Sequence, residues 1–449
     1  MEFNVLKTSS SETVISFDSI APHKEDNYSR IGTKIISRIL AGYSGEIAVE
    51  LWDGTLVHGK HNAPCTIIFK APCALRDLVL HRNILRLAEC YLTNTIEVEG
   101  DLEALFSFKT YLTKLNLPFM TNVFLLTQAL RLPSQGHYNF IKNWCEKFSS
   151  HRNSRNSIAH HYDVSNDFYS LWLDPEMVYS CAYFRDKNQS LAAAQRDKLD
   201  YLCRKLRLQP GHTLLDIGCG WGALAIYAAR KYGVTVHGIT LSEAQQEHAL
   251  QRVRAEGLEH QVNIELLDYR DLSMDAEYDR VVSVGMFEHI GVRNFPVYFG
   301  TVKRVLKPGG LFLNHGITSD TAWQHTPMTR FINRYIFPDG ELARISDVAD
   351  AMEKAGFELL DTEGLRRHYA YTLRHWVKAL EENCEEAIQK TSEITYRLWR
   401  LYMAGSAHYF EEGSIGVYQL LVGHQRNNLT IPLRRDDLYS DQGLDVIVN

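Results

Sequence analysis

The chain has 449 residues, and its 48 Lys and Arg against 54 Asp and Glu give a formal net charge of −6. This length allows two domains with a sizeable core, and the slightly acidic balance gives no reason to expect nucleic-acid binding. The eight cysteines show no CxxC pair and no ligand-like spacing, so we expect neither a disulfide framework nor a bound metal. They suit a reducing cytosol.

Residues 1–25 are polar and rich in serine, which is typical of a mobile tail. The basic start and apolar run of a secretion signal are missing there. No window reaches the roughly 18 uncharged apolar residues of a membrane span. We therefore predict a soluble, cytoplasmic protein that can touch a membrane surface without crossing it.

Residues 26–117 are predicted to form a small α+β domain. The stretch IAVELWDGTLVHGK (47–60) alternates apolar and polar residues around Asp53 and Gly54, as β-hairpins do. A further strand is predicted for CTIIFKAP (65–72), and ALRDLVLHRNILRLAECYL (74–92) has helical spacing.

Residues 118–160 are predicted to link this domain to the next one, through an apolar helix around FLLTQAL (124–130). The run at 142–155 that follows is rich in Lys, Arg and His. Such a run is usually a solvated linker, but it would attract anionic head groups if the substrate were a lipid.

Within residues 161–449, strand and helix patterns alternate from about residue 210 onward, which predicts a parallel sheet covered on both faces. Two insertions, at 321–342 and from Tyr369 to about Phe410, follow strands, where α/β enzymes build their substrate pockets. The predicted strands are TLLDIG, TVHGIT, NIELLDY, YDRVVSVG, GLFLNHGI and, last, IGVYQLLVGHQ, with helices beginning near Trp221, Ser242 and Phe295.

The stretch LLDIGCGWGAL (214–224) places Gly218, Gly220 and Gly222 between a strand and a helix, where the backbone can turn tightly beside a ligand. The spacing departs from the G-x-G-x-x-G of dinucleotide-binding folds. Asp216, before the turn, suits the cationic amino-acid end of S-adenosylmethionine, and Asp268 is placed to accept a hydrogen bond from an adenine amino group. A simple packing turn is the alternative, but strand, turn, helix and second acid together favour a cofactor site.

Six segments carry a family likeness: HYDVSNDFYSLWLDPEMVYSCAYF (161–184), LLDIGCGWGALAIYAA (214–229), GITLSEAQ (238–245), FEHIG (287–291), FINRYIFPDGEL (331–342) and HYAYTLRHW (368–376). Together they resemble the cyclopropane-fatty-acyl-phospholipid synthases and their mycolic-acid relatives. The likeness implies an α/β fold in which residues 161–449 form a Rossmann-like class I methyltransferase domain with helical lid insertions. The preceding α+β domain is similar in style to the lipid-associated accessory domain of the bacterial phospholipid enzymes.

The resemblance implies an enzyme that adds the methyl group of S-adenosylmethionine to a cis double bond of an unsaturated phospholipid. Loss of a proton from the added methyl then closes a three-membered ring. A carbocation arises on the way, so water must be excluded and aromatic faces can stabilise the charge. A weak base must also lie beside the methyl without itself being alkylated.

Family members use a bound bicarbonate ion as this base, and the resemblance assigns its holders to Cys181, Glu288, His315, Tyr369 and the main chain of Ile317. Ionised Glu288 would accept the hydroxyl proton of the anion and increase its basicity, while the other four groups donate hydrogen bonds to it. In this interpretation Cys181 is neither a nucleophile nor a metal ligand. Singly, each residue has an ordinary alternative as a core, structural or surface group. As a set they favour an anion site.

The turn and the resemblance also imply a set of cofactor-binding residues. They are Tyr179, Ser180, Asp216, Gly218, Cys219, Gly220, Trp221, Gly222, Thr240, Ser242, Gln245, Asp268, Tyr269 and Arg270. Phe331 and Tyr335 are candidate ring faces for the cation, or they only pack the lid. Family members often have a cysteine in the helix that here reads YMAGSAHYF, and Ser406 takes its place, so a thiol role is not expected there.

The lipid substrate creates an energetic requirement. Exposing about nine methylenes to water costs about 7 kcal/mol, so an apolar channel must replace the bilayer. We expect the insertions around 320–345 and 369–410 to form it, with Arg366 and Arg367 or the 142–155 run at its head-group end. For the two arginines, solvated loop charge is an equal alternative. The family precedent implies a homodimer at the inner face of the membrane.

Three functions therefore compete. The first is cyclopropanation of phospholipid acyl chains, and the second uses the same cofactor and alkene but leaves a methyl or methylene branch. The third is a lipid-binding or scaffold protein with an inactive methyltransferase domain. Retention of Cys181, Glu288, His315 and Tyr369 favours the ring product, and the intact glycine turn argues against an inactive domain.

Overall fold

The computed structural model describes residues 22–81, 84–134, 165–273, 278–337, 340–426 and 431–439. The basic run at 142–155 and residues 1–21 of the predicted tail lie outside the described residues. Helix α1 (Pro22–Ile39) begins inside the range predicted as a tail. Across the part of the chain that is described, no helix is both long and apolar enough to span a bilayer.

Residues 22–134, called the N-terminal region below, contain a four-stranded sheet in the order β2-β1-β3-β4. The predicted hairpin is present, because β1 (Ile47–Glu50) and β2 (Leu56–His58) pair antiparallel. Strand β3 (Cys65–Phe69) pairs with β1 in parallel and with β4 (Ile96–Gly100) antiparallel. The helices of this region are α1, α2 (Pro72–His81), α3 (Ile84–Leu92), α4 (Ala104–Lys114) and α5 (Phe119–Ala129).

A seven-stranded sheet with the order β10-β11-β9-β8-β5-β6-β7 forms the centre of the rest of the chain. Its strands are β5 (Thr213–Ile217), β6 (Thr235–Thr240), β7 (Val262–Leu266), β8 (Tyr278–Val284), β9 (Leu306–Ser319), β10 (Phe357–Gly364) and β11 (Ile415–His424). The first five of these pair in parallel, as the alternating pattern predicts.

The prediction of an all-parallel sheet is wrong at one side, where β11 runs antiparallel to both β9 and β10. Strand β10 was also missed, because its sequence FELLDTEG has polar residues on both faces and lies at the sheet edge. The result is a mixed sheet of mostly parallel strands, the class I methyltransferase arrangement that the resemblance implies.

Helices cover both faces of this sheet. One core joins α9 (Leu191–Lys205), α10 (Ala223–Tyr232) and α11 (Glu243–Ala255) to the sheet, and another joins α12 (Phe295–Val305) and α14 (Ile345–Lys354). Because helices cover both faces of the sheet, a site can open beyond the carboxyl ends of the strands.

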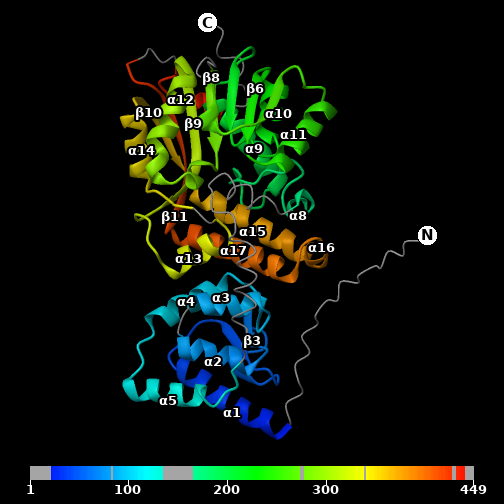
Figure 1. Ribbon diagram of the computed structural model, residues 1–449, viewed down its shortest axis with the longest axis vertical. Coiled ribbons are helices and arrows are strands. Elements are labelled where there is room, and N and C mark those ends of the chain that lie inside the picture. The colour runs from blue at the N-terminus through cyan, green and yellow to red at the C-terminus, as the bar shows by residue number, and fades with distance from the viewer. Residues whose placement is uncertain are drawn as a thin grey trace, which may run out of the picture.

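The two insertions lie between the seven-stranded sheet and the N-terminal region, as Figure 1 shows in yellow and orange. They contain α13 (Pro327–Tyr335), α15 (Arg366–Glu382), α16 (Cys384–Lys390) and α17 (Glu393–Glu412). Leu398, Leu401 and Ala404 of α17 and Phe331 of α13 belong to the same apolar core as the N-terminal sheet. The insertions therefore hold the two parts of the chain together.

Two buried arginines of α17 add polar contacts to this junction. Arg400 donates to the Tyr91 hydroxyl at 3.0 Å, the Val98 carbonyl at 3.2 Å and the Gly100 carbonyl at 3.3 Å. Arg397 pairs with Glu97 in the same way. Each contact satisfies a polar group that the junction removes from water.

We predict that Arg400→Ala lowers the free energy of unfolding by about 2–4 kcal/mol, because several buried acceptors lose their donor at once. Urea titration followed by circular dichroism measures this change. Lys378→Ala is the control, since that side chain is 75% exposed and should change stability by less than about 0.5 kcal/mol. Equal effects of the two substitutions would contradict the assignment.

Candidate active site

Two cavities open at the strand ends of the seven-stranded sheet. The larger has a volume of about 430 Å³ and the smaller about 170 Å³. Tyr179, Ser180, Gly285 and His289 line both of them. These four residues mark the place where a molecule in one cavity can meet a molecule in the other.

The smaller cavity, called the cofactor cavity below, forms around the glycine turn between β5 and α10. Gly218 and Gly220 have φ angles of +82° and +55°, which residues with a Cβ rarely adopt. Most of the predicted cofactor residues line this cavity: Tyr179, Ser180, Asp216, Gly218, Cys219, Gly220, Trp221, Thr240, Gln245, Asp268, Tyr269 and Arg270.

Gly222 and Ser242 of the predicted set are not among its lining residues. Gly222 precedes α10 with φ +81°, and a Cβ there would come within 3.0 Å of the Ala249 side chain. Ser242 caps α11, where its hydroxyl accepts a hydrogen bond from the Gln245 N–H. In this structure both residues shape the cavity through the backbone.

Asp216 is the buried acid of the cofactor cavity. Its Oδ2 atom has no hydrogen-bond partner, and burial raises the pKa of its carboxyl to about 7, although the nearby Lys198 lowers it. A buried carboxylate without a partner is costly and calls for a cationic or hydrogen-bonding ligand.

Lys198 of α9 was not predicted as a site residue. It is buried, it donates to the Ser180 hydroxyl at 2.9 Å, and burial lowers its pKa to about 8 despite the nearby Asp174 and Asp216. The only signal for Lys198 in the sequence was its place on the side of α9 that faces the core. A single lysine in a polar helix is usually solvated, so this signal is weak.

Asp268 follows β7 and is buried beneath Arg270. Its carboxylate accepts hydrogen bonds from the Arg270 backbone N–H at 2.9 Å and from the guanidinium at 2.9 and 2.6 Å. The carboxylate therefore already has donors in this structure, and any adenine amino group would share it with Arg270.

The segment 178–184, which carries Cys181, is held between α9 and α15. Gln195 donates to the Ser180 carbonyl at 2.9 Å, and the Ala182 N–H donates to the Thr372 hydroxyl at 3.0 Å. Cys181 itself is buried, and its thiol lies 3.3 Å from the Ala182 carbonyl. Burial raises the pKa of Cys181 well above its usual value, so the group remains a thiol and a donor.

Glu288 lies in the short turn Phe287–His289 after β8, and its carboxylate approaches β9. The Ile317 N–H donates to Glu288 Oε1 at 3.4 Å, whereas Oε2 has no partner. A Cβ on Gly316 would come within 2.7 Å of Oε2, so glycine is required for this approach. Burial raises the pKa of Glu288 to about 7.

His315 of β9 stands opposite Gln419 of β11 in the strand register. The Gln419 amide donates to His315 Nδ1 at 3.1 Å, which leaves the ring proton on Nε2, and Nε2 has no partner. Burial lowers the pKa of His315 to about 3, so the ring is neutral. Gln419 was missed, because its role comes from a strand pairing that the sequence pattern did not predict.

The five predicted catalytic residues come together in the lining of the larger cavity. They are Cys181, Glu288, His315, Ile317 and Tyr369. Tyr369 lies on α15 with its ring centroid 4.6 Å from that of Phe410. Among the described residues, no group of three His, Cys, Asp or Glu side chains is placed to hold a metal ion.

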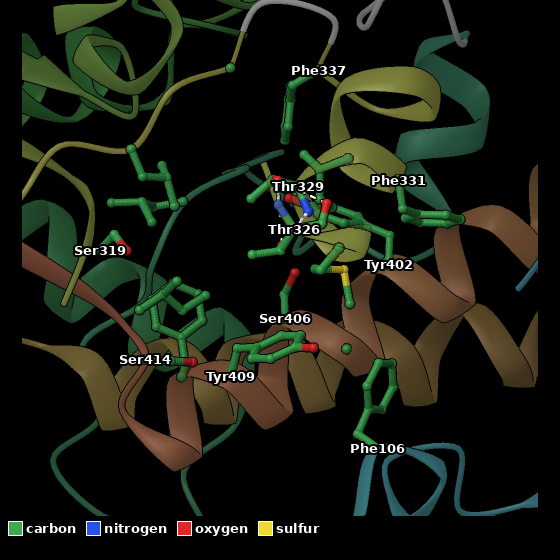
Figure 2. Close-up of a pocket in the computed structure, with 18 of the residues that line it drawn as sticks. Phe106, Ser319, Thr326, Thr329, Phe331, Phe337, Tyr402, Ser406, Tyr409 and Ser414 are labelled. Carbon is green, nitrogen blue, oxygen red and sulfur yellow. Dashed lines mark hydrogen bonds between the residues drawn. The ribbon is translucent and has the colours of Figure 1, made fainter. Parts of the chain in front are cut away.

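Away from these residues the larger cavity is mostly apolar, and it is called the acyl cavity below. The insertions line it as predicted, with residues 319–332 on one side and α17 on another (Figure 2). Phe331 lines the cavity but Tyr335 does not, because its hydroxyl donates to Glu89 at 3.1 Å. Ser406 also lines it and lies beside the Tyr402 hydroxyl.

The N-terminal region supplies a further wall of the acyl cavity, which the sequence did not predict. Figure 2 shows Phe106 pointing from this region toward Tyr409 of α17. The lining residues from this region are Ile67, Leu85, Leu87, Ala88, Tyr91, Ile96, Val98, Leu105, Phe106 and Lys109. Arg366 and Arg367 are not among the lining residues, and Arg366 donates instead to the Glu411 carbonyl at 2.6 Å, at the end of α17.

Comparison with known proteins places this geometry in a family. A family model described as mycolic acid cyclopropane synthetase matches residues 148–420, more than half of the chain. The chain belongs to this family. A second model, a domain of unknown function, matches residues 35–115 of the N-terminal region.

Two relatives with curated descriptions are named for different lipid-modifying activities. A "probable fatty acid methyltransferase" from Pseudomonas putida is 40% identical over 403 residues, which cover 88% of this chain and 96% of that protein. The "cyclopropane-fatty-acyl-phospholipid synthase" of Escherichia coli K12 is 42% identical over 261 residues, which cover 58% of this chain and 66% of that protein.

Among solved structures, mycolic acid cyclopropane synthase CmaA1 complexed with SAH and CTAB is 36% identical with a TM-score of 0.57. The match covers 61% of this chain and 99% of CmaA1. The protein is therefore an S-adenosylmethionine-dependent methyltransferase of the cyclopropane and methyl fatty acid synthase family.

We predict that Asp216→Ala weakens binding of S-adenosylhomocysteine at least tenfold, because the cofactor cavity loses its buried acid. Lys198→Met should weaken binding of S-adenosylhomocysteine at pH 7 and weaken it less at pH 8.5. Without the ammonium the pKa of Asp216 rises further, so a higher pH is needed to ionise it. Titration calorimetry at both pH values measures this.

Lys354→Met serves as the control for these two variants, since its side chain is 74% exposed. If Lys198→Met binds as the control does at pH 7, Lys198 has no part in the cofactor site.

We predict that turnover rises with pH through a midpoint near 7, because only ionised Glu288 can accept a proton. Glu288→Gln should reduce kcat at least a hundredfold. Glu288→Gln should also be more stable than wild type at high pH. Because folding raises the pKa of Glu288, the free energy of unfolding of the wild type falls as the pH rises from about 4.5 to 7, by about 3 kcal/mol in total.

Unfolding titrations at pH 5 and pH 8 measure the second effect, with the 63% exposed Glu382→Gln as control. A Glu288→Gln variant with full turnover, or with the same relative stability at both pH values, would contradict this assignment.

Proposed function

We propose that this enzyme converts cis double bonds in the acyl chains of unsaturated phospholipids to cyclopropane rings, with bicarbonate as the base. The observation that supports the proposal is the junction of the two cavities. There the unpartnered Glu288 Oε2 and His315 Nε2 lie in the lining of an apolar cavity that shares a wall with the glycine turn.

The cofactor cavity fits S-adenosylmethionine, because it offers a buried acid without a partner beside a turn whose glycines leave the backbone accessible. When bound, the cofactor supplies an electrophilic methyl group. Asp216 would hold its amino-acid end, and Asp268 with Arg270 its adenosine end. The related CmaA1 structure complexed with SAH supports this assignment.

The donor and acceptor set at the junction fits bicarbonate. When bound, bicarbonate supplies a weak base that the methyl donor does not readily alkylate. His315 Nε2–H would donate to it, and the Ile317 N–H would exchange its contact with Glu288 Oε1 for one with the anion, while ionised Glu288 would accept the hydroxyl proton of the anion. Cys181 would exchange its present contact with the Ala182 carbonyl for a contact with the anion.

The chain also provides the dry surroundings that a cationic acyl chain needs. Cys181, Glu288 and His315 are all at least 95% buried, so bulk water has little access to the junction. The rings of Tyr369 and Phe410, which are tilted by 33° to each other, line the same cavity, and the faces of aromatic rings stabilise positive charge.

The acyl cavity supports a lipid substrate. At about 430 Å³ it falls within the range of natural ligand sites, and its lining is predominantly apolar. The E. coli relative is described as acting on fatty-acyl phospholipids, which supports the same substrate class here. Action at the inner face of the cytoplasmic membrane and a homodimeric state stay predictions.

Formation of a methyl or methylene branch is the second candidate. It is favoured by the fatty acid methyltransferase of P. putida, which matches the chain over both the N-terminal region and the catalytic part. The two reactions share the cofactor, the alkene and the first carbocation. Loss of a proton from the added methyl with closure onto the cation gives the ring, loss from a neighbouring chain carbon gives a methyl-branched alkene, and a 1,2-hydride shift before loss from the methyl gives a methylene branch. Placement of a base at the junction favours ring closure.

We predict that incubation with methyl-labelled S-adenosylmethionine and vesicles of unsaturated phospholipid places the label in cyclopropane rings. Mass spectrometry and proton NMR of the acyl chains distinguish ring protons from branch signals. Removing dissolved carbon dioxide should lower the rate, and added bicarbonate should restore it. Branch signals alone would support the second candidate, and no label in lipid would overturn both.

A further inference from the structure

The N-terminal region carries an exposed apolar surface that the proposed active site does not use. Five large apolar side chains project from α5 and its C-terminal end into solvent. They are Phe119 (78% exposed), Met120 (74%), Val123 (38%), Leu126 (38%) and Leu130 (60%), called the α5 apolar face below. The other large apolar side chains that are exposed in the described residues are scattered over different elements.

These side chains form a stripe along the helix. At 100° per residue, Phe119, Val123, Leu126 and Leu130 fall within an arc of about 60°. Leu125 and Ala129, roughly 130° and 90° around the helix from the centre of this arc, are buried in the core of the N-terminal region. Helix α5 is therefore amphipathic in an unusual way, because it has one apolar side facing the core and a second facing solvent.

A basic stripe lies next to this face. Arg30, Lys34 and Arg38 are spaced four residues apart on α1, all three are exposed, and α1 packs against α5. The Arg38 guanidinium lies 5.4 Å from the centre of the Phe124 ring of α5. These three residues are called the α1 basic stripe below.

Negative charge is sparse in the sequence around both elements, where α1 carries Glu25 and Asp26 near its start. Residues 27–45 and 104–145 contain no Asp or Glu, although 54 acidic residues are distributed over the chain. Exposed Lys114 and Arg131 flank α5 at its two ends. An apolar face with a cationic border is the pattern that binds the surface of an anionic bilayer.

We propose that the α5 apolar face inserts into the acyl boundary of an anionic phospholipid bilayer while the α1 basic stripe contacts the head groups. Helix α5 has 11 residues, or about 16 Å, so it can lie in the interface but cannot span the membrane. In Figure 1, α1 and α5 form the end of the molecule farthest from the seven-stranded sheet, where a bilayer can reach them.

A second copy of the chain is a less suitable occupant. A stable interface needs roughly 20–30 residues on each side, whereas the α5 apolar face has five. In a two-fold symmetric contact the α1 basic stripe would also lie near its own copy, and like charges would repel. Anionic lipid offers the opposite charge.

The inference rests on the proposed function for its partner, phospholipid. Vesicle binding is measured without cofactor, so it is tested separately from the proposed reaction. We predict that Phe119→Ser/Met120→Ser lowers the partition coefficient onto vesicles of 30% phosphatidylglycerol and 70% phosphatidylcholine at least tenfold. Sedimentation with sucrose-loaded vesicles measures this. Both side chains are mostly exposed, so the fold should be unaffected.

The matched control is Val297→Ser/Leu359→Ser, which removes two exposed apolar side chains elsewhere and should bind within twofold of wild type. Arg30→Glu/Lys34→Glu/Arg38→Glu should lose the preference for anionic over neutral vesicles. Calorimetry with S-adenosylhomocysteine verifies that each variant retains an intact cofactor site.

Vesicle binding of Phe119→Ser/Met120→Ser equal to that of wild type would overturn the inference. A decrease in molar mass by light scattering, with vesicle binding unchanged, would also overturn it and assign the face to contact between copies. If vesicle binding of the variant falls as predicted but the wild-type enzyme places no label in lipid, the membrane-binding surface is confirmed and the proposed reaction is wrong.

Discussion

The site depends on one constraint, which is that polar atoms without partners are kept away from water in the walls of two adjoining cavities. Glu288 Oε2, His315 Nε2 and Asp216 Oδ2 are buried and unpaired within the chain. Such atoms lower the stability of the fold unless a ligand pairs with them. A ligand that does so removes this penalty and binds more tightly. The same burial raises the pKa of both acids to about 7.

The geometry that maintains this constraint is assembled from distant parts of the chain. Segment 178–184 lies between α9 and α15, β9 and β11 set the register of His315 with Gln419, and Gly316 lets Glu288 approach the sheet. The N-terminal region closes the acyl cavity from the other side. Each contact is ordinary on its own. Together they bring the candidate site residues to the same end of the strands of one sheet.

Much of this was predictable from the sequence, because strong local patterns coincide with the elements that matter. The glycine turn and the parallel strands follow from alternation and from residues that only a tight turn needs. A family likeness located five residues that meet in the lining of the acyl cavity. Lys198, Gln419 and the wall from the N-terminal region were missed, since each depends on which surfaces meet in three dimensions. Strand β10 escaped because an edge strand with polar residues on both faces has no distinct period.

The wall that the N-terminal region contributes has a consequence for the evolution of substrate choice. CmaA1 is matched over 99% of its length by 61% of this chain, so a large part of this chain has no counterpart in that relative. In the present protein, residues such as Phe106 and Leu105 border the same space as Ser406 and Tyr409. If the proposed acyl substrate occupies this space, substitutions far from the glycine turn would change which chain lengths fit, and the two parts of the polypeptide would be constrained to change together.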